Sequence, residues 1–305
     1  MRIVANSIPK SGTHLLDRLL VLLGFEMVDL GGVRPHLAKS NYRFPLVNKR
    51  LKSILGLRGP EDVMGIGPHL VEGGRFRPAR RLLRGRGEKV TVGVVSPQHI
   101  SRRWLARRLS KVPDGSFVNA HCIYTPELAD LFRQQGMRTV CILRDPRDVA
   151  VSQMHYIKER RQHFAHEGYM ALPSDRERLL VSIHGGELDG RRLQSLAERY
   201  RQFLSWERDG GAVMVKFEDL VGTKGGGSEE AQRLAVERVA RHLGVAAEEG
   251  TLRRVEKDLF GVGRTFRKGQ IGGWREEFSA EHEEAVKEVM GSLLVELGYE
   301  AGPDW

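Results

Sequence analysis

The segment IVANSIPKSGTHLLDRLLVLLG, residues 3–24, contains the pattern on which the predicted fold rests. Its apolar start, residues 3–7, predicts a buried strand, and its amphipathic end, residues 15–23, predicts a helix that stops at Gly24. A short turn with Pro9 and Gly12 joins the two. A strand that enters a helix through such a turn is typical of an α/β sheet.

The same alternation recurs after residue 116, where apolar runs are separated by helical patterns. Strands are predicted at 117–120, 139–143 and 212–217, and helices at 126–135, from 146 onward and after the glycine run 225–227. A run at 89–96 also alternates like a strand, and a basic helix follows it at 101–109. Strands separated by helices favour a parallel sheet covered on both faces. We therefore expect a single α/β domain over residues 1–305, with a central parallel sheet flanked by helices.

The composition is that of a globular chain of 305 residues, with 40% hydrophobic and 29% charged residues. No apolar stretch approaches the roughly 18 residues that a membrane span needs, and polar residues interrupt the opening run, which argues against a signal peptide. Only Cys122 and Cys141 are present, so we expect no disulfide framework and a cytoplasmic location.

Positive charge is concentrated in one part of the chain. The formal net charge is +10, and Lys and Arg far outnumber Asp and Glu between Arg34 and Lys111. Such a field attracts anionic ligands, nucleic acid, an acidic partner or an anionic membrane face, and it is equally compatible with a plain solvated surface.

The turn PKSGTH, residues 9–14, has the features of a phosphate-binding loop. Gly12 lets the backbone approach an anion closely, Lys10 supplies charge, and Ser11 and Thr13 supply hydroxyl groups at a helix N-terminus. The order differs from the nucleotide-triphosphatase loop, in which the Lys follows the last Gly. An ordinary capped helix start is the alternative interpretation of this segment.

Two further motifs combine charge with a turn. RDPRDVAVS, residues 144–152, places Arg144 at a strand end, where its planar fork suits a second anion. RKGQIGGWR, residues 267–275, sets two adjacent cations in a glycine-rich loop. Each motif alone is also compatible with a plain helix cap or a surface loop.

In this order, together with VKFEDL at 215–220, the motifs resemble the sulfotransferases that use 3′-phosphoadenosine 5′-phosphosulfate (PAPS), above all the cytosolic type. The resemblance implies a P-loop-like sulfotransferase fold, PAPS as sulfuryl donor and no metal. The residues that it implies for binding the 5′-phosphosulfate are Lys10, Ser11, Gly12, Thr13 and, as a further contact, His14. Those that it implies for binding the 3′-phosphate are Arg144, Ser152, Arg267, Lys268 and Gly269, and Phe217 takes the place of a cofactor-binding Tyr.

The resemblance also implies the catalytic group. His121 follows a strand where the family has its catalytic histidine, so we expect it to be the general base. Lys10 is expected to stabilise the leaving oxygen, and Ser152 to hold Lys10 until the acceptor arrives. Three departures from the family bear on the cofactor and acceptor sites. Leu15 replaces the usual Trp, Asn119 replaces a Lys that often precedes the histidine, and Phe217 replaces the usual Tyr.

The acceptor is expected to be a small-molecule hydroxyl, with carbohydrate, lipid and amine acceptors as alternatives. Residues 31–115 and 157–195 depart most from the family, so we expect them to form the acceptor side, the second as a closing lid. A basic nucleic-acid-binding protein is the rival from another class, but residues 34–111 contain few aromatics for base stacking, and no nucleic acid is expected. The residues around Ser279 match the family's short dimerisation segment only in part, and an ordinary helix cap is the other interpretation. Homodimer and monomer are therefore both alternatives.

Overall fold

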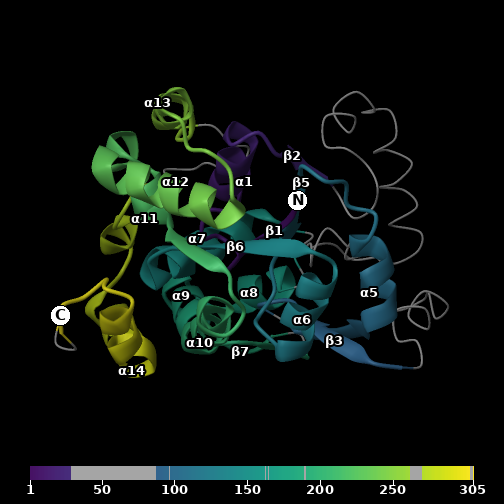
Figure 1. The fold of residues 1–305 in the computed structure, drawn as a ribbon. Coiled ribbons are helices and arrows are strands. Elements are labelled where there is room, and N and C mark those ends of the chain that lie inside the picture. Colours follow the sequence, from purple (N-terminus) through teal and green to yellow (C-terminus); the bar gives the residue numbers. More distant parts are fainter. Residues whose placement is uncertain are drawn as a thin grey trace, which may run out of the picture.

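A five-stranded parallel sheet forms the centre of the protein (Figure 1). The computed structural model describes residues 1–28, 87–95, 97–161, 163, 165–188, 190–261, 270–302 and 305. The strand order is β2-β5-β1-β6-β9. The strands are β1 (Arg2–Ser7), β2 (Glu26–Met27), β5 (Ser116–Ala120), β6 (Met137–Leu143) and β9 (Val213–Lys216). The predicted α/β fold class is confirmed.

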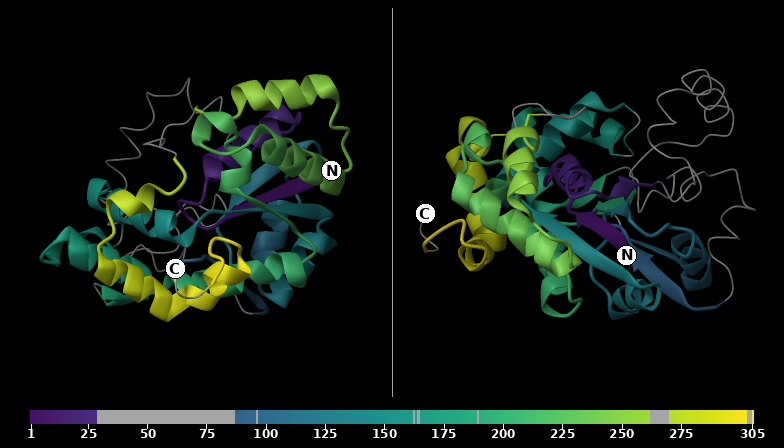
Figure 2. Two further views of the ribbon diagram at one scale, coloured as in Figure 1. Left: turned by 90° about the vertical axis from the view of Figure 1, so that its left-hand side faces the viewer. Right: turned by 45° about the horizontal axis from the view of Figure 1, so that its top comes forward.

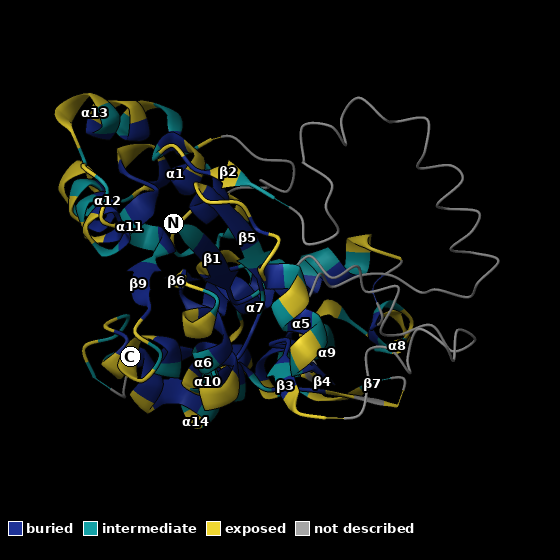
Figure 3. Cartoon of the chain, turned by 45° about the vertical axis from the view of Figure 1, so that its right-hand side comes forward, coloured by how far each residue is buried: buried dark blue, intermediate teal, exposed yellow. Residues whose placement is uncertain are grey.

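Alternation along the strands divides the core into two layers, one on each face of the sheet. In β1, Ile3 and Ala5 pack into one hydrophobic cluster, while Val4 between them packs into the other. Adjacent side chains of a strand point to opposite faces, so a strand buried on both faces is apolar throughout. In Figure 3 the sheet is accordingly dark blue along most of its length.

Helices cover both faces of the sheet, as Figures 1 and 2 show. One face carries α1 (Thr13–Leu22), α12 (Glu229–Leu243) and α13 (Glu249–Asp258). The other carries α6 (Pro126–Gln134), α7 (Pro146–Glu159) and α10 (Leu196–Arg208), with α9 (Asp175–His184) and α14 (Ala280–Glu296) packed outside them. The shorter helical elements are α5 (Arg102–Leu109), α8 (His166–Ala171), α11 (Phe217–Leu220), η2 (Thr223–Gly225) and η3 (Gly273–Glu276).

Two hairpins lie outside the main sheet. The strand predicted at 89–96 ends early, as β3 (Lys89–Val92), and pairs antiparallel with β4 (Gln98–Ser101). Gly93 follows β3 with a φ of 99°, which turns the chain back and lets the nearest downstream segment become its partner. The second hairpin joins β7 (Gly186–Leu188) to β8 (Arg191–Leu193).

The two regions expected on the acceptor side are described unequally. Most of 31–115, up to residue 86, lies outside the described residues. Within 157–195, α9 buries Leu179 and Ile183 and packs against α7 and α14. That this region closes as a lid stays a prediction. Among the described residues, no helix has the length and apolar composition that crossing a bilayer requires.

The order of the strands fixes where a ligand can bind. The chain moves from β1 out to β2, returns to β5 on one side of β1, and then crosses to β6 on the other. In open parallel sheets, ligands bind beyond the carboxyl ends of the strands at such a reversal. The loops that follow β1, β5, β6 and β9 all start at this edge, and they contain most of the predicted site residues.

Candidate active site at the carboxyl ends of the strands

The turn after β1 has the geometry of an anion cradle. Lys10 has a φ of 75°, and no other non-glycine residue among those described has a positive φ. Gly12, with a φ of 107°, is the N-cap of α1 and supplies no side-chain cap, and the first turn of α1 contains no acidic residue. The first N–H groups of a helix have no carbonyl partner within it. The backbone N–H groups at the start of α1 are therefore suited to an anion.

Ser11 fixes the shape of this turn. Its hydroxyl is fully buried, and its single proton is shared between the carbonyl oxygens of Ile8, at 2.7 Å, and Ile142, at 3.1 Å. The hydroxyl thus ties the turn to the end of β1 and to β6. Its predicted contact with the 5′-phosphosulfate stays a prediction.

His121 lies beside the cradle, because the register that pairs Asn6 with Ala120 places it next to Ser7. Its Nδ1 is 2.8 Å from the carbonyl oxygen of Ser7 and 3.0 Å from the hydroxyl of Ser7. That hydroxyl is also 2.8 Å from the Thr13 hydroxyl. A carbonyl oxygen only accepts hydrogen bonds, so the proton of a neutral His121 lies on Nδ1, and Nε2 has the lone pair.

Lys10 is held by an aromatic ring on α7. Its ammonium lies 4.4 Å from the centre of the Tyr156 ring. Ser152 lies one helical turn before Tyr156, and residues four apart share a face of a helix. The predicted partnership of Ser152 with Lys10 stays a prediction, and the structure adds Tyr156 to the same helix face.

Arg144 and the cradle meet at Phe217. The guanidinium of Arg144, at the end of β6, lies 4.5 Å from the centre of the Phe217 ring. A Cβ built on Gly12 would lie 2.7 Å from the Phe217 ring, so the ring also packs closely against the cradle. Arg144 Nε is buried and has no hydrogen-bond partner. An unpartnered cationic donor at this place suits an anionic ligand.

Asp148 joins the second and third motifs. Its carboxylate accepts the backbone N–H groups of Gly272, at 3.0 Å, and Trp274, at 2.9 Å. It also lies 3.4 Å from Arg144 Nη2, which donates to the carbonyl of Gln270 at 3.0 Å. Burial raises the pKa of Asp148 above its usual value, and the charge of Arg144 opposes this effect.

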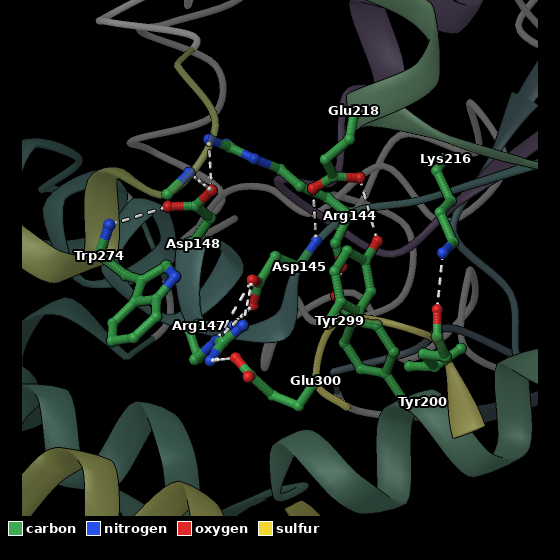
Figure 4. A network of polar contacts seen from close by, with 12 residues as sticks. Arg144, Asp145, Arg147, Asp148, Tyr200, Lys216, Glu218, Trp274, Tyr299 and Glu300 are labelled. Atoms are coloured by element: carbon green, nitrogen blue, oxygen red, sulfur yellow. Dashed lines mark hydrogen bonds and ion pairs between the residues drawn. The ribbon is translucent and has the colours of Figure 1, made fainter. Parts of the chain in front are cut away.

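The C-terminal segment is tied to the same motif, as Figure 4 shows. Arg147 is almost completely buried, and its guanidinium forms a fork on Asp145, at 2.7 Å, and an ion pair with Glu300. The rings of Trp274 and Trp305 lie 4.2 Å and 4.5 Å from that guanidinium. Cation–π contacts of a desolvated arginine are worth up to about 2 kcal/mol each.

Glu218, on α11 just after β9, supports the same loop (Figure 4). It accepts the backbone N–H of Asp145 at 2.8 Å and the hydroxyl of Tyr299 at 3.0 Å. Burial raises the pKa of Glu218 to about 7. Tyr200 adds a third contact by donating to the carbonyl of Arg144 at 2.6 Å. The backbone of the second motif is thus fixed from α11, α10 and the C-terminal segment.

The remaining predicted residues are placed less closely or not at all. His14 is largely exposed, and its Nδ1 lies 3.5 Å from Asp17. Arg267, Lys268 and Gly269 lie outside the described residues. Ser279 is the N-cap of α14, and its N–H and hydroxyl lie 2.9 Å and 3.0 Å from His282 Nδ1; the choice between homodimer and monomer stays a prediction. Burial raises the pKa of the Cys122 thiol to about 12, so this thiol is unsuited to nucleophilic chemistry. Over the described ranges, no cluster of three or more His, Cys, Asp or Glu could hold a metal ion.

Sequence reasoning missed the residues that position the predicted ones. They are Ser7, Asp17, Asp148, Tyr156 and Glu218. Three of them had a usable signal, because Asp148 lies within the second motif, Tyr156 lies one turn after Ser152, and Glu218 lies within VKFEDL. The other two, Ser7 and Asp17, interact with site residues that are distant in sequence or lie on another element.

Similar folds exist among solved structures. A mouse sulfotransferase crystallised with 3′-phosphoadenosine 5′-phosphate (PAP) superposes with a TM-score of 0.56 at 13% identity, covering 98% of this chain and 86% of that one. A retinol dehydratase with androsterone and the inactive cofactor PAP gives a TM-score of 0.54 at 17% identity, covering 96% and 80%. No curated protein sequence matches this chain. A sequence profile of the sulfotransferase domain matches residues 2–260, and the chain therefore belongs to the sulfotransferase domain family.

Proposed function

We propose that this sulfotransferase transfers a sulfuryl group from PAPS to a hydroxyl of a small molecule, with His121 as general base. The observation that carries the proposal is the hydrogen bond from His121 Nδ1 to the Ser7 carbonyl beside the cradle of Lys10 and Gly12. It favours the tautomer with the proton on Nδ1, in which Nε2 has the lone pair that a general base needs. Family membership and the PAP present in similar structures support the choice of donor.

The residues present fit a donor with two anionic ends. The uncapped start of α1, with Lys10 and Thr13, suits the 5′-phosphosulfate, and the buried, unpartnered Nε of Arg144 suits the 3′-phosphate. When bound, PAPS would supply the activated sulfuryl group. Proposed contacts that the structure leaves as predictions are those of Ser11, His14, Phe217, Ser152, Arg267, Lys268 and Gly269.

The chain's own groups then have distinct tasks. His121 removes the proton of the acceptor hydroxyl, and the Ser7 carbonyl stabilises the imidazolium that forms, because it accepts the Nδ1 proton in both states. Lys10 offers positive charge where negative charge develops on the leaving side. Tyr156 and Ser152, on one face of α7, hold that ammonium in place.

The proposed acceptor is the type usual in this family, and it is compatible with one imidazole as the base. A small-molecule hydroxyl is the first candidate, and carbohydrate, lipid and amine acceptors are the alternatives. A cytoplasmic location, the absence of nucleic acid as a partner and the choice between monomer and homodimer also stay predictions.

Calorimetric titration with PAP tests the donor site. We expect wild type to bind PAP, and Arg144→Ala to lose most of that affinity. Arg138→Ala, an exposed arginine near the other end of β6, is the matched control and should bind like wild type. A wild type that does not bind PAP would refute the proposed donor.

A second variant tests the base. His121→Asn should bind PAP normally. In the presence of an acceptor it should convert PAPS to PAP about 10²- to 10⁴-fold more slowly than wild type, since a general base contributes about that much to the rate. Turnover within twofold of wild type would show that another group removes the proton.

A further inference from the structure

A second polar layer lies beside the predicted base, between α1 and β5. Asn119 Nδ2 donates to Asp17 Oδ2 at 2.9 Å, and we refer to these two residues as the Asp17–Asn119 pair. Asp17 lies one turn after Thr13 on α1, and Asn119 lies two residues before His121. Residues four apart on a helix, and two apart on a strand, share a face. Thr13 and His121 are joined through Ser7. The Asp17–Asn119 pair joins the same two segments of the chain again, one helical turn further along α1 and two residues earlier in the chain than His121.

Both members of the pair have an oxygen without a partner. Asp17 Oδ1 and Asn119 Oδ1 are buried and accept no hydrogen bond, and Asp17 as a whole is only 9% exposed. A carboxylate only accepts, and the amide must turn its nitrogen toward it, so neither residue can satisfy the other's remaining oxygen. A buried acceptor left unpaired costs about 1–3 kcal/mol. Two neighbouring acceptors thus lack a donor.

A ligand group can reach the pair from the side of His14. The His14 side chain is 56% exposed, and its Nδ1 lies 3.5 Å from Asp17 Oδ2, so the carboxylate is in contact with an exposed side chain. The pair lies about 6 Å from the level of Thr13 and His121, from the rise of one helical turn and of two strand residues. A small acceptor molecule with its reacting hydroxyl at His121 can span that length.

We propose that the Asp17–Asn119 pair is a specificity subsite that binds a hydrogen-bond-donating substituent of the acceptor. The inference rests on the proposed function, because it places the reacting hydroxyl at His121. The shared chemistry is an N–H or O–H group about 6 Å from that hydroxyl. The negative charge of Asp17 makes an ammonium group the preferred donor, with a hydroxyl second. Apolar mono-alcohols and simple phenols leave the two oxygens unpaired and bind more weakly.

Three phenols with the same reacting hydroxyl test this proposal. They are tyramine, tyrosol and 4-ethylphenol, whose two-carbon side chains end in an ammonium, a hydroxyl or a methyl group. Dissociation constants are measured by calorimetry on the PAP-loaded protein, and KM is measured where PAPS is turned over. We expect tyramine to bind at least tenfold more tightly than 4-ethylphenol, with tyrosol between them.

Two variants locate the effect. Asp17→Asn should remove the advantage of tyramine over tyrosol, because the charge is gone, and Asp17→Leu should make all three phenols bind alike. Glu230→Gln, an exposed charge on α12, is the control for net charge and should keep the wild-type ranking. Every variant must bind PAP with wild-type affinity, which confirms its fold and keeps the donor site out of the comparison.

Two outcomes would overturn the subsite. In one, wild type binds the three phenols equally or binds neither tyramine nor tyrosol. In the other, the ranking survives in Asp17→Leu. Failure of the proposed function is distinguishable, since it would appear as wild-type protein that does not bind PAP.

Discussion

Glu218→Gln tests whether a partly buried carboxyl braces the second motif. The carboxyl accepts hydrogen bonds from the Asp145 N–H and the Tyr299 hydroxyl, and burial raises its pKa from the usual 4.5 to about 7. A raised folded-state pKa means that the native state binds the proton more tightly than the unfolded state. Glu218 therefore lowers stability as the pH rises through the interval from 4.5 to about 7. At about 1.4 kcal/mol per pKa unit, the full loss is about 3 kcal/mol.

Glutamine has the same shape and does not titrate, so the variant should be spared this loss. We expect the free energy of unfolding of Glu218→Gln, relative to wild type, to rise by about 3 kcal/mol between about pH 4 and about pH 8. Urea unfolding across that range measures it. Glu288→Gln, an exposed position on α14, should show no such trend. A relative stability of Glu218→Gln that stays constant with pH would refute the reasoning, because it would mean that Glu218 is ionised normally in the fold.

Three further variants test the site. Gly12→Ala should weaken PAP binding at least tenfold, because its Cβ would lie 2.7 Å from the Phe217 ring. Gly24→Ala is the control, with a similar φ of +96° but no atom within 4 Å of its Cβ, and it should leave PAP affinity unchanged. Equal effects of the two variants on PAP affinity would contradict the cradle. Asp148→Asn should weaken PAP binding about 5- to 100-fold, since it disturbs two backbone hydrogen bonds worth about 1–3 kcal/mol. An unchanged affinity in calorimetry would show that this carboxylate does not support the 3′-phosphate site. Ser7→Ala should lower kcat about two- to tenfold and leave PAP affinity unchanged. The carbonyl contact to His121 remains in this variant, while the hydroxyl contact, worth about 1 kcal/mol, is lost. An unchanged kcat would show that this hydroxyl does not position the base.

Local patterns were enough to predict four of the five strands of the main sheet, while β2, which is only two residues long, was not predicted. The strands β1, β5, β6 and β9 are largely apolar, and most predicted site residues lie just after them, as with Arg144 after β6 and His121 after β5. The third motif, residues 267–275, follows the helix α13 in the chain instead. Parallel strands bring their carboxyl ends to one edge, and the motifs that follow these strands meet there. The strand at 89–96 was predicted with the wrong length because Gly93 ends it and a local hairpin partner follows.

The supporting contacts could not be predicted in the same way. Ser7 looks like the last residue of a strand, and its role depends on the register that sets His121 opposite it. Glu218 looks like an acidic residue after a strand, and its shifted pKa depends on burial beneath the C-terminal segment. The substitution of Lys by Asn at position 119 was visible in the sequence, but its partner Asp17 was visible only in the structure.

The two ends of the proposed donor site are supported by different parts of the protein. The cradle around Lys10 is fixed by contacts to β6 and to the residue just after β1, such as those of the buried Ser11 hydroxyl. The Arg144 side is fixed by residues from the far end of the chain, through Asp148, Arg147 and Glu218. Changes near the C-terminus should therefore act first on the 3′-phosphate side, while the imidazole and the cradle keep their geometry. Phe217 couples the two sides, because its ring contacts Arg144 and packs closely against Gly12 in the cradle.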